Sequence, residues 1–188
     1  MSIAHEMAPG ELELVRTFIN TQTPDHPDDL TSPEALQAWL AERDLLDRGA
    51  RVSSGEFARA VKVREALREL ASHDECADCA DEALDTLREA AARAPLVLAF
   101  GDNRKLTLEP LDRGVDGAMS RLIAIVHQAV HDGQWPRLKL CRDPGCAWAF
   151  YDRSKNRSGA WCDMASCGNR NKARRRRATA GFSGGSAG

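Results

Sequence analysis

Four cysteines near the C-terminal end of this 188-residue chain have the residue type and the spacing of a metal site. Cys141 and Cys146 form one pair, Cys162 and Cys167 form a second, and fifteen residues separate the two pairs. Two short-spaced pairs joined by a hairpin-sized insert supply the four thiolates that a tetrahedral zinc site requires. Because four thiolates leave no open coordination position for a substrate, we predict one zinc ion with a structural role.

The segment that contains these cysteines is strongly basic. Residues 137–177 hold twelve Lys or Arg and three acids, a net formal charge of +9, whereas the rest of the chain holds 14 bases and 25 acids, a net −11. Four thiolates with one Zn²⁺ lower the charge of the segment to about +7. Two regions of opposite sign indicate two roles, one of which involves a polyanion.

Half of these Lys and Arg residues fall on a helix that we expect to begin near Cys167. So many like charges on three turns repel one another unless a polyanion is bound. Arginine pairs bidentately with phosphate or guanine, and asparagine pairs with adenine. A basic loop before the second cysteine pair suits the phosphate backbone. The candidate nucleic-acid contacts are therefore Asn169, Arg170, Lys172, Arg174, Arg175, Arg176 and Arg177 on the helix, with Arg153, Lys155 and Arg157 in the loop.

The same residues also have structural interpretations, which the sequence leaves open. Residues next to a metal often orient its ligands, so Asn169 can hydrogen-bond near the thiolates and Arg170 can pack on Trp161 or on the N-terminal domain. The other cations can form a merely solvated face. Helical geometry separates two faces, one with Asn169, Lys172 and Arg176 and the adjacent one with Arg170, Arg174 and Arg177.

A family resemblance rests on the pattern Cys141-x4-Cys146-x15-Cys162-x4-Cys167-Gly-Asn-Arg170, with Trp161 before the third cysteine and Lys172 beyond the arginine. This pattern closely resembles the CGNR zinc finger, which ends bacterial proteins whose N-terminal part is called the ABATE domain. The opening of that domain is similar to Phe18-Ile-Asn-Thr21 and the helix with Leu36, Trp39 and Leu40. The resemblance covers about residues 12 to 178. It implies an α+β N-terminal domain, a zinc-bound C-terminal module and a role in DNA binding and stress-induced transcription regulation.

The chain departs from that family pattern beside the third cysteine. Family members commonly have one or two arginines directly before the Trp-Cys pair and a serine after it. This chain has Gly159-Ala160 and Asp163 at those positions. Each change removes positive charge or adds negative charge, which weakens the case for phosphate contacts there. The run from Arg174 to Arg177 compensates with added positive charge.

The remaining residues predict the elements that position the finger. Residues 96–100 and 105–109 are typical of two short strands in a hairpin, and residues 138–140 and 148–151 predict strands on either side of the first cysteine pair. Apolar spacing and capping residues predict five helices: Leu12 to Ile19, one after Thr31-Ser-Pro-Glu34 that breaks near 47–49, one capped by Ser53 or Ser54, one after a pause at 73–74 that runs up to Pro95, and one over 112–132.

We therefore predict an α+β chain in three parts. Residues 1–134 form a mostly helical domain with a small antiparallel hairpin, residues 135–178 form a treble-clef-like zinc finger, and residues 179–188 form a disordered tail. Since the chain has no run of eighteen apolar residues and its N-terminus lacks a basic flank and an apolar core, we expect no membrane span, no signal peptide and a cytoplasmic location.

Two weaker motifs remain. The i, i+3 pair of Cys76 and Cys79 is compatible with a redox pair, or with a metal site completed by His73, but helical register favours small buried core residues. His127 and His131 have i, i+4 spacing without the glutamate of a hydrolytic zinc helix, so we expect core or surface histidines. Because a chain without an export signal keeps its thiols reduced, metal binding is favoured over three disulfides.

These observations predict a zinc-containing DNA-binding regulator. The finger contacts duplex DNA, and the acidic N-terminal domain binds a small-molecule effector or mediates assembly. The alternative is a protein-interaction or RNA-binding module, because zinc knuckles also serve those roles. We do not expect an enzyme, since the zinc is saturated and the sequence has no glycine-rich phosphate loop and no Gly-x-Ser-x-Gly elbow.

Overall fold

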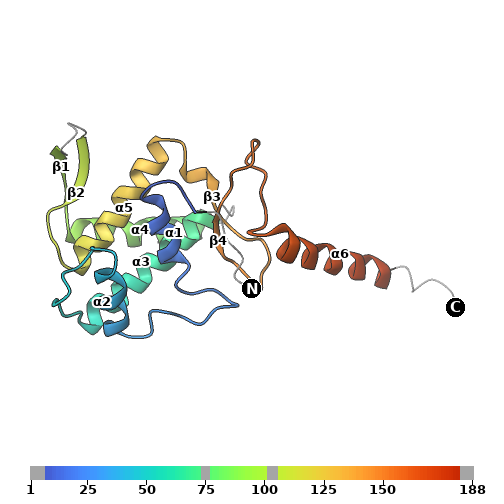
Figure 1. Ribbon diagram of the computed structural model, residues 1–188, viewed down its shortest axis with the longest axis horizontal. Helices are drawn as coiled ribbons and strands as arrows, with labels where there is room; N and C mark the ends of the chain where they lie inside the picture. The colour runs from blue at the N-terminus through green and yellow to red at the C-terminus, as the bar shows by residue number, and fades with distance from the viewer. Residues whose placement is uncertain (1–6, 73–76, 101–105, 183–188) are drawn as a thin grey trace.

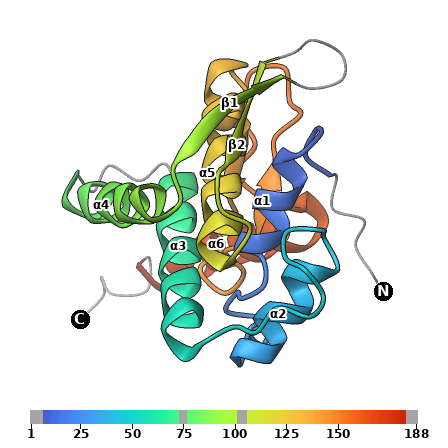
Figure 2. The same cartoon turned by 90° about the vertical axis from the view of Figure 1, so that its left-hand side faces the viewer.

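The elements follow one another in the order that the sequence predicts, and the fold is α+β with a mostly helical body (Figures 1 and 2). The computed structural model describes residues 7–72, 77–100 and 106–182. The body consists of α1 (Leu12–Ile19), α2 (Pro33–Ala41), α3 (Ser54–Ser72), α4 (Ala77–Arg93), β1 (Leu96–Phe100), β2 (Leu106–Pro110) and α5 (Val115–His131). The C-terminal segment consists of η1 (Trp135–Arg137), β3 (Leu138–Leu140), β4 (Ala149–Tyr151), η2 (Met164–Gly168) and α6 (Asn169–Phe182).

Two helix starts show why the capping residues predict these boundaries. The Ser32 hydroxyl accepts a hydrogen bond from the Ala35 amide at 3.2 Å, directly before a proline in the first turn of α2. At α3, the Ser53 hydroxyl accepts from the Glu56 amide at 3.3 Å, and the Glu56 carboxylate accepts from the Ser53 amide at 2.8 Å. This reciprocal pair is a capping box, which satisfies amides that a helix leaves without internal partners.

The body has one apolar core. Helices α1, α3 and α5 contact one another, while α2 packs against α3, and α4 packs against both α3 and α5. Phe18, Leu36 and Leu67 are fully buried there, and the ring of Phe18 lies 5.2 Å from that of Trp39. Burial of such side chains stabilises the fold by about 1.5–3 kcal/mol each, so this core is the main source of stability in the body.

Two arginines, Arg16 and Arg64, are buried in the body, although helical periodicity alone does not predict buried charges. Arg64 is 3% exposed, and its guanidinium donates to both carboxylate oxygens of Asp28, at 2.7 and 2.9 Å, and to the Thr21 hydroxyl at 3.1 Å. A buried charge is tolerated only when it is paired and hydrogen-bonded. The Asp28–Arg64 pair therefore ties the loop after α1 to α3.

The apolar core extends beyond the body into the cysteine segment. The strands β3 and β4 pair antiparallel, with Leu138 opposite Tyr151, and they contact α3 and α1. Leu138 and Ala149 are fully buried in the same apolar cluster as Phe18. One face of this small hairpin therefore belongs to the core of the body.

The last helix differs from the prediction at its C-terminal end. Helix α6 continues to Phe182, so residues 179–182, which the sequence assigned to a disordered tail, are helical. Figure 1 shows α6 pointing away from the body. Within the described ranges, no helix is both long enough and apolar enough to cross a membrane.

Candidate metal centre and basic helix

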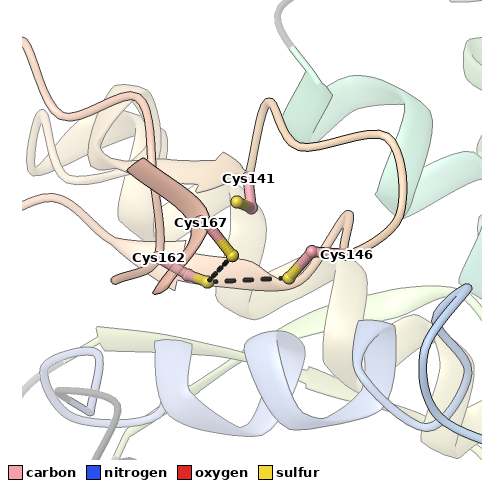
Figure 3. A group of neighbouring side chains, drawn as sticks. All are labelled: Cys141, Cys146, Cys162 and Cys167. Carbon is pink, nitrogen blue, oxygen red and sulfur yellow. Dashed lines mark hydrogen bonds between the residues drawn. The ribbon is translucent and has the colours of Figure 1, made fainter. Parts of the chain in front are cut away.

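The four cysteines converge on one point between the finger hairpin and the start of α6 (Figure 3). Their sulfur atoms all lie within 4.8 Å of one another. Cys141 follows β3, Cys167 lies in the π-helical turn η2, and Cys146 and Cys162 lie in the loops between. Three of the four are buried and Cys162 is partly buried. The fold thus brings together the residues that the spacing selected.

The sulfur spacing suits a tetrahedral zinc ion. A Zn–S bond of about 2.3 Å implies sulfur atoms about 3.8 Å apart at the corners of a tetrahedron. The Cys162 sulfur lies 3.6 Å from that of Cys146 and 3.7 Å from that of Cys167. Four soft sulfur donors at this separation are the ligand set of a structural zinc, and they fit one ion.

The ionisation of Cys141, Cys146 and Cys162 also favours a bound cation. Hydrogen bonds from Cys146 and Cys162 lower the pKa of Cys141 to about 2. The hydrogen bond to Cys141, followed by burial and its charge, raises the pKa of Cys146 to about 12 and that of Cys162 further still. Once one thiolate forms, its neighbours resist ionisation, so four thiolates coexist only around a positive ion.

The first cysteine pair lies on a tight backbone turn. The amides of Cys146 and Ala147 both donate to the Asp143 carbonyl, at 2.8 and 3.1 Å, and the Cys141 amide donates to the Trp148 carbonyl at 2.9 Å. Ala147 has a positive φ of 48°, which reverses the chain toward β4. These bonds hold the backbone of the turn that carries Cys141 and Cys146.

Asp143, in this turn, has no exposed surface and connects the turn to the basic helix. Its two carboxylate oxygens lie 2.7 Å from Arg170 Nε and 2.8 Å from Arg174 Nη1, and one oxygen also accepts from the Gly145 amide. Burial opposes the charge, but the hydrogen bonds from Arg174 and Gly145 and the charge of Arg170 outweigh it and lower the pKa of Asp143. Arg170 also donates to the Cys167 sulfur at 3.0 Å.

Asp152 has a similar role in the basic loop. It is 4% exposed and accepts from Lys139 Nζ at 2.8 Å, the Ser154 amide at 2.9 Å and the Gly159 amide at 2.8 Å. Burial raises its pKa, but these bonds lower it well below the ordinary range. A Cβ at Gly159 would lie 2.8 Å from the Asp152 carboxylate, so the missing arginine at this position has a steric reason.

Asp163 is the third acid of the segment and caps η2. Its carboxylate accepts from the Ala165 amide at 3.1 Å and the Ser166 amide at 3.0 Å. All three acids of the basic segment therefore serve the internal structure of the finger. In the sequence these acids are only negative charges, because no spacing signal distinguishes them from surface acids.

The finger docks onto the body through a buried polar contact. The Asn20 side chain accepts from the Ala149 amide at 2.7 Å and donates to the Ala149 carbonyl at 2.9 Å. Arg16 donates to the same carbonyl at 3.3 Å, and the Tyr151 hydroxyl donates to Gln134 Oε1 at 3.1 Å. The outer edge of β4 is thus closed by a side chain of the body, which fixes the finger against it.

The candidate nucleic-acid contacts divide into two groups in the structure. In the first group, Asn169 donates to the Ala165 carbonyl at 2.9 Å, while Arg170 and Arg174 pair with Asp143. Arg153 donates to the Met7 carbonyl at 2.9 Å, and its guanidinium lies over the Tyr151 ring. The others are exposed side chains of α6 and the loop: Lys155, Arg157, Lys172, Arg175, Arg176 and Arg177.

The weaker motifs have no place in the zinc centre. Cys79 is exposed on α4 and is disulfide-bonded, so the expectation of a small buried residue is wrong. Cys76 and His73 lie outside the described residues. His127 and His131 are exposed on α5, which agrees with surface histidines. Among the described residues, the four clustered cysteines are the only group of three or more candidate ligands placed to hold a metal ion.

Two family models match successive parts of the chain. Residues 12–132 match the family model named ABATE, described as "Putative stress-induced transcription regulator". Residues 137–180 match the family model of the CGNR zinc finger. A search of curated proteins gave no match. Both family names refer to regulation or zinc binding, and neither names an enzymatic activity.

Proposed function

Since this chain belongs to the ABATE family and ends in a CGNR zinc finger, we propose that it is a regulator whose finger binds duplex DNA. The observation that carries the proposal is α6, a basic helix that begins at the zinc centre and points away from the body (Figure 1). A projecting helix of this kind is able to enter the major groove, where helices read base edges.

Within this proposal, the two faces of α6 have different tasks. Arg170 and Arg174 lie on the face that meets Asp143, and each is about half exposed. Lys172 and Arg176 lie on another face, because successive residues of an α-helix are about 100° apart. The Asp143 face orients the helix, and the face with Lys172 and Arg176 contacts phosphates and bases.

The zinc has an indirect role in this function. When bound, it supplies the folding energy that a segment of this size lacks. The cysteines hold the first turn of α6, which follows η2. Asp143 then sets the direction of α6 through its ion pairs with Arg170 and Arg174. The finger therefore depends on its metal for shape, and the contacts with DNA come from the cations beyond it.

Salt dependence of binding tests the proposal. If the zinc-loaded chain neutralises four to six phosphates, log K for duplex DNA should fall against log salt with a slope of about −4 to −5. The double variant Lys172→Gln, Arg176→Gln should reduce the slope by about 2. The matched control Arg88→Gln removes a charge that pairs with Asp85 on α4 and should leave the slope unchanged. A chain that fails to bind duplex DNA at low salt contradicts the proposal.

Asp143→Asn separates orientation of α6 from simple charge attraction. The variant removes one negative charge, so charge alone predicts tighter binding to DNA. Loss of orientation predicts the opposite, about a tenfold weaker affinity for the selected sequence, because the helix no longer has one direction. Fragments selected from random duplex DNA provide that sequence. Equal affinity for single-stranded RNA of random sequence would favour the alternative of an RNA-binding module.

A further inference from the structure

The β1–β2 hairpin has one face made entirely of apolar residues. The strands pair antiparallel with Leu98 opposite Leu108 and Phe100 opposite Leu106. Because side chains alternate across a strand, opposite residues share a face. The apolar face contains Leu96, Leu98, Phe100, Leu106, Leu108 and Pro110, and the other face contains Val97, Ala99, Thr107 and Glu109.

The body covers only part of this apolar face. Leu96 and Leu108 are partly buried, whereas Leu98 is 69% exposed, Phe100 is 78% exposed and Leu106 is 57% exposed. An antiparallel sheet normally turns its apolar face toward a core and its polar face toward water. A two-stranded hairpin is also marginally stable alone. The exposed half of this face therefore lacks the cover that such a ribbon needs.

A groove of about 520 Å³ lies between this face and α5. On the hairpin side the groove is lined by Leu98, Leu106 and Leu108 together with Thr107. On the other side α5 contributes Ala124 and Ile125 but also polar side chains, and the rest of the lining is Arg121, His127, Gln128, His131 and Glu11. In Figures 1 and 2 the hairpin rises alongside α5 at one edge of the body. The hairpin side of the groove is thus an apolar wall that faces an open and partly polar surface, rather than an enclosed cavity for a small molecule.

The chemistry of the apolar hairpin face limits which kinds of partner can bind it. The face carries no charged residue and therefore offers nothing to a nucleic acid. The residues outside 137–177 carry a net charge of −11, which opposes an anionic membrane surface. An apolar face that is uniform across both strands is complementary to its own copy, because a two-fold axis brings the same residues together from both sides.

The exposed area of this face limits how strongly two copies can pair. The exposed parts of Leu98, Phe100 and Leu106 amount to about 400 Å² per copy, so face-to-face contact buries about 800 Å² of these side chains in total. The α5 wall of the groove raises this toward the total of about 1,000 Å² that a specific interface needs. An interface of this size belongs to the weak, transient class, so the dimer should dissociate readily.

We propose that a second copy of this chain packs its own hairpin face against this one, forming a two-fold dimer. The dimer does not rest on the proposed function, since the hairpin and the zinc finger are separate surfaces. If the finger also binds DNA, the dimer presents two fingers to two half-sites.

Sedimentation velocity of the full zinc-loaded chain over about 1 to 200 μM tests the dimer, since dimers held by small interfaces dissociate in this range. The wild-type chain should shift from one to two copies as its concentration rises. Leu98→Lys should shift the midpoint at least tenfold upward, because it places a charge in the interface. The matched control Val97→Lys places the same charge one residue away, opposite Glu109 on the other face, and should behave as wild type.

Two results would overturn the dimer. One is a wild-type chain that remains a single copy throughout this range, which would leave the face to another protein or an apolar ligand. The other is an equal shift for Leu98→Lys and Val97→Lys. Far-ultraviolet circular dichroism and zinc content establish that both variants are folded. If the chain stays a monomer but still binds DNA in a salt-dependent way, the dimer is wrong and the proposed DNA-binding function stands.

Discussion

The body and the finger of this chain are stabilised by different physical means. The body buries large apolar side chains such as Phe18, Leu36 and Leu67. The finger buries little besides its cysteines and Phe150, and three acids hold its loops and helix in place. A segment of this size cannot bury enough apolar surface to fold alone, so zinc and ion pairs replace the missing core.

The boundary between the two does not lie at the start of the finger. Leu138 and Ala149 are buried in the body, although β3 leads directly into Cys141. One strand pair therefore serves both regions, with one side in the apolar core and its end at the metal. Because β3 and β4 are held by the apolar core of the body, removal of zinc should disorder only the part of the finger that lies beyond these strands.

Cys162→Ser should produce the largest effect and test that boundary directly. Loss of one thiolate removes most of the roughly 10–16 kcal/mol that zinc supplies to such a segment. Zinc should be released, and hydrogen exchange should become fast beyond residue 152 while β3 and β4 keep protection. Metal analysis and exchange mass spectrometry measure both results. Cys79→Ser, outside the cluster, should keep its zinc; a full complement of zinc in Cys162→Ser would contradict the ligand assignment.

Phe18→Ala tests how much the apolar core of the body contributes to stability. The fully buried ring leaves a cavity, which should lower the free energy of unfolding by about 3–5 kcal/mol. Urea denaturation of the zinc-loaded chain measures the change. Phe100→Ala is the matched control, because its ring is 78% exposed and its loss from a single copy should cost less than about 0.5 kcal/mol. Equal losses for the two variants would show that Phe18 is not a core residue.

Asn20→Ala tests the contact between the two regions. Truncation leaves the Ala149 amide buried without its acceptor, which should destabilise the chain by about 1–3 kcal/mol. Hydrogen exchange at β4 should rise more than exchange at α2, which lies away from the joint. Asn156→Ala removes the same side chain from an exposed site in the basic loop and should have no measurable effect. Unchanged protection of β4 would mean that the finger docks by other contacts.

Acid should produce the smallest effect, at the Asp28–Arg64 pair in the body. Burial of Asp28 opposes its charge, but hydrogen bonds from Arg64 and the Leu30 amide lower its pKa below 3.8. Since the folded pKa is the lower one, the pair stabilises the fold above about pH 4, and this contribution of about 1 kcal/mol is lost as pH falls further. Urea denaturation between pH 6 and 3 should show a shallower decline in Asp28→Asn.

Glu42→Gln is the control for that measurement, because Glu42 is 73% exposed and its pair with Arg43 lies at the surface. It should leave the pH dependence of stability as in the wild type. If the free energy of unfolding depends on pH identically in Asp28→Asn and the wild type, the Asp28–Arg64 pair does not contribute to the acid sensitivity of the fold. Zinc release below pH 5 affects every variant alike, so the differences between variants isolate the body.

The local features of this chain were readable from its sequence. Ser32 and Pro33 fix the start of α2, alternating and periodic apolar residues give the strands and helices, and the spacing of Cys141, Cys146, Cys162 and Cys167 gives the zinc site. Each of these signals arises between residues that are close in the chain. Turn geometry, capping and metal chelation act over such short distances, so they are already expressed in the order of residues.

Only the tertiary structure decided which charges are paired inside the finger. Asp143 meets Arg174 across thirty-one positions, and Asn20 meets Ala149 across 129. Neither pairing leaves a periodic trace, because burial and electrostatic compensation depend on which surfaces the folded chain brings together. The sequence determined that the C-terminal segment binds zinc and is basic. Folding determined that Arg170 and Arg174 brace the helix, that Lys172 and Arg176 remain exposed, and that the apolar hairpin face is left open.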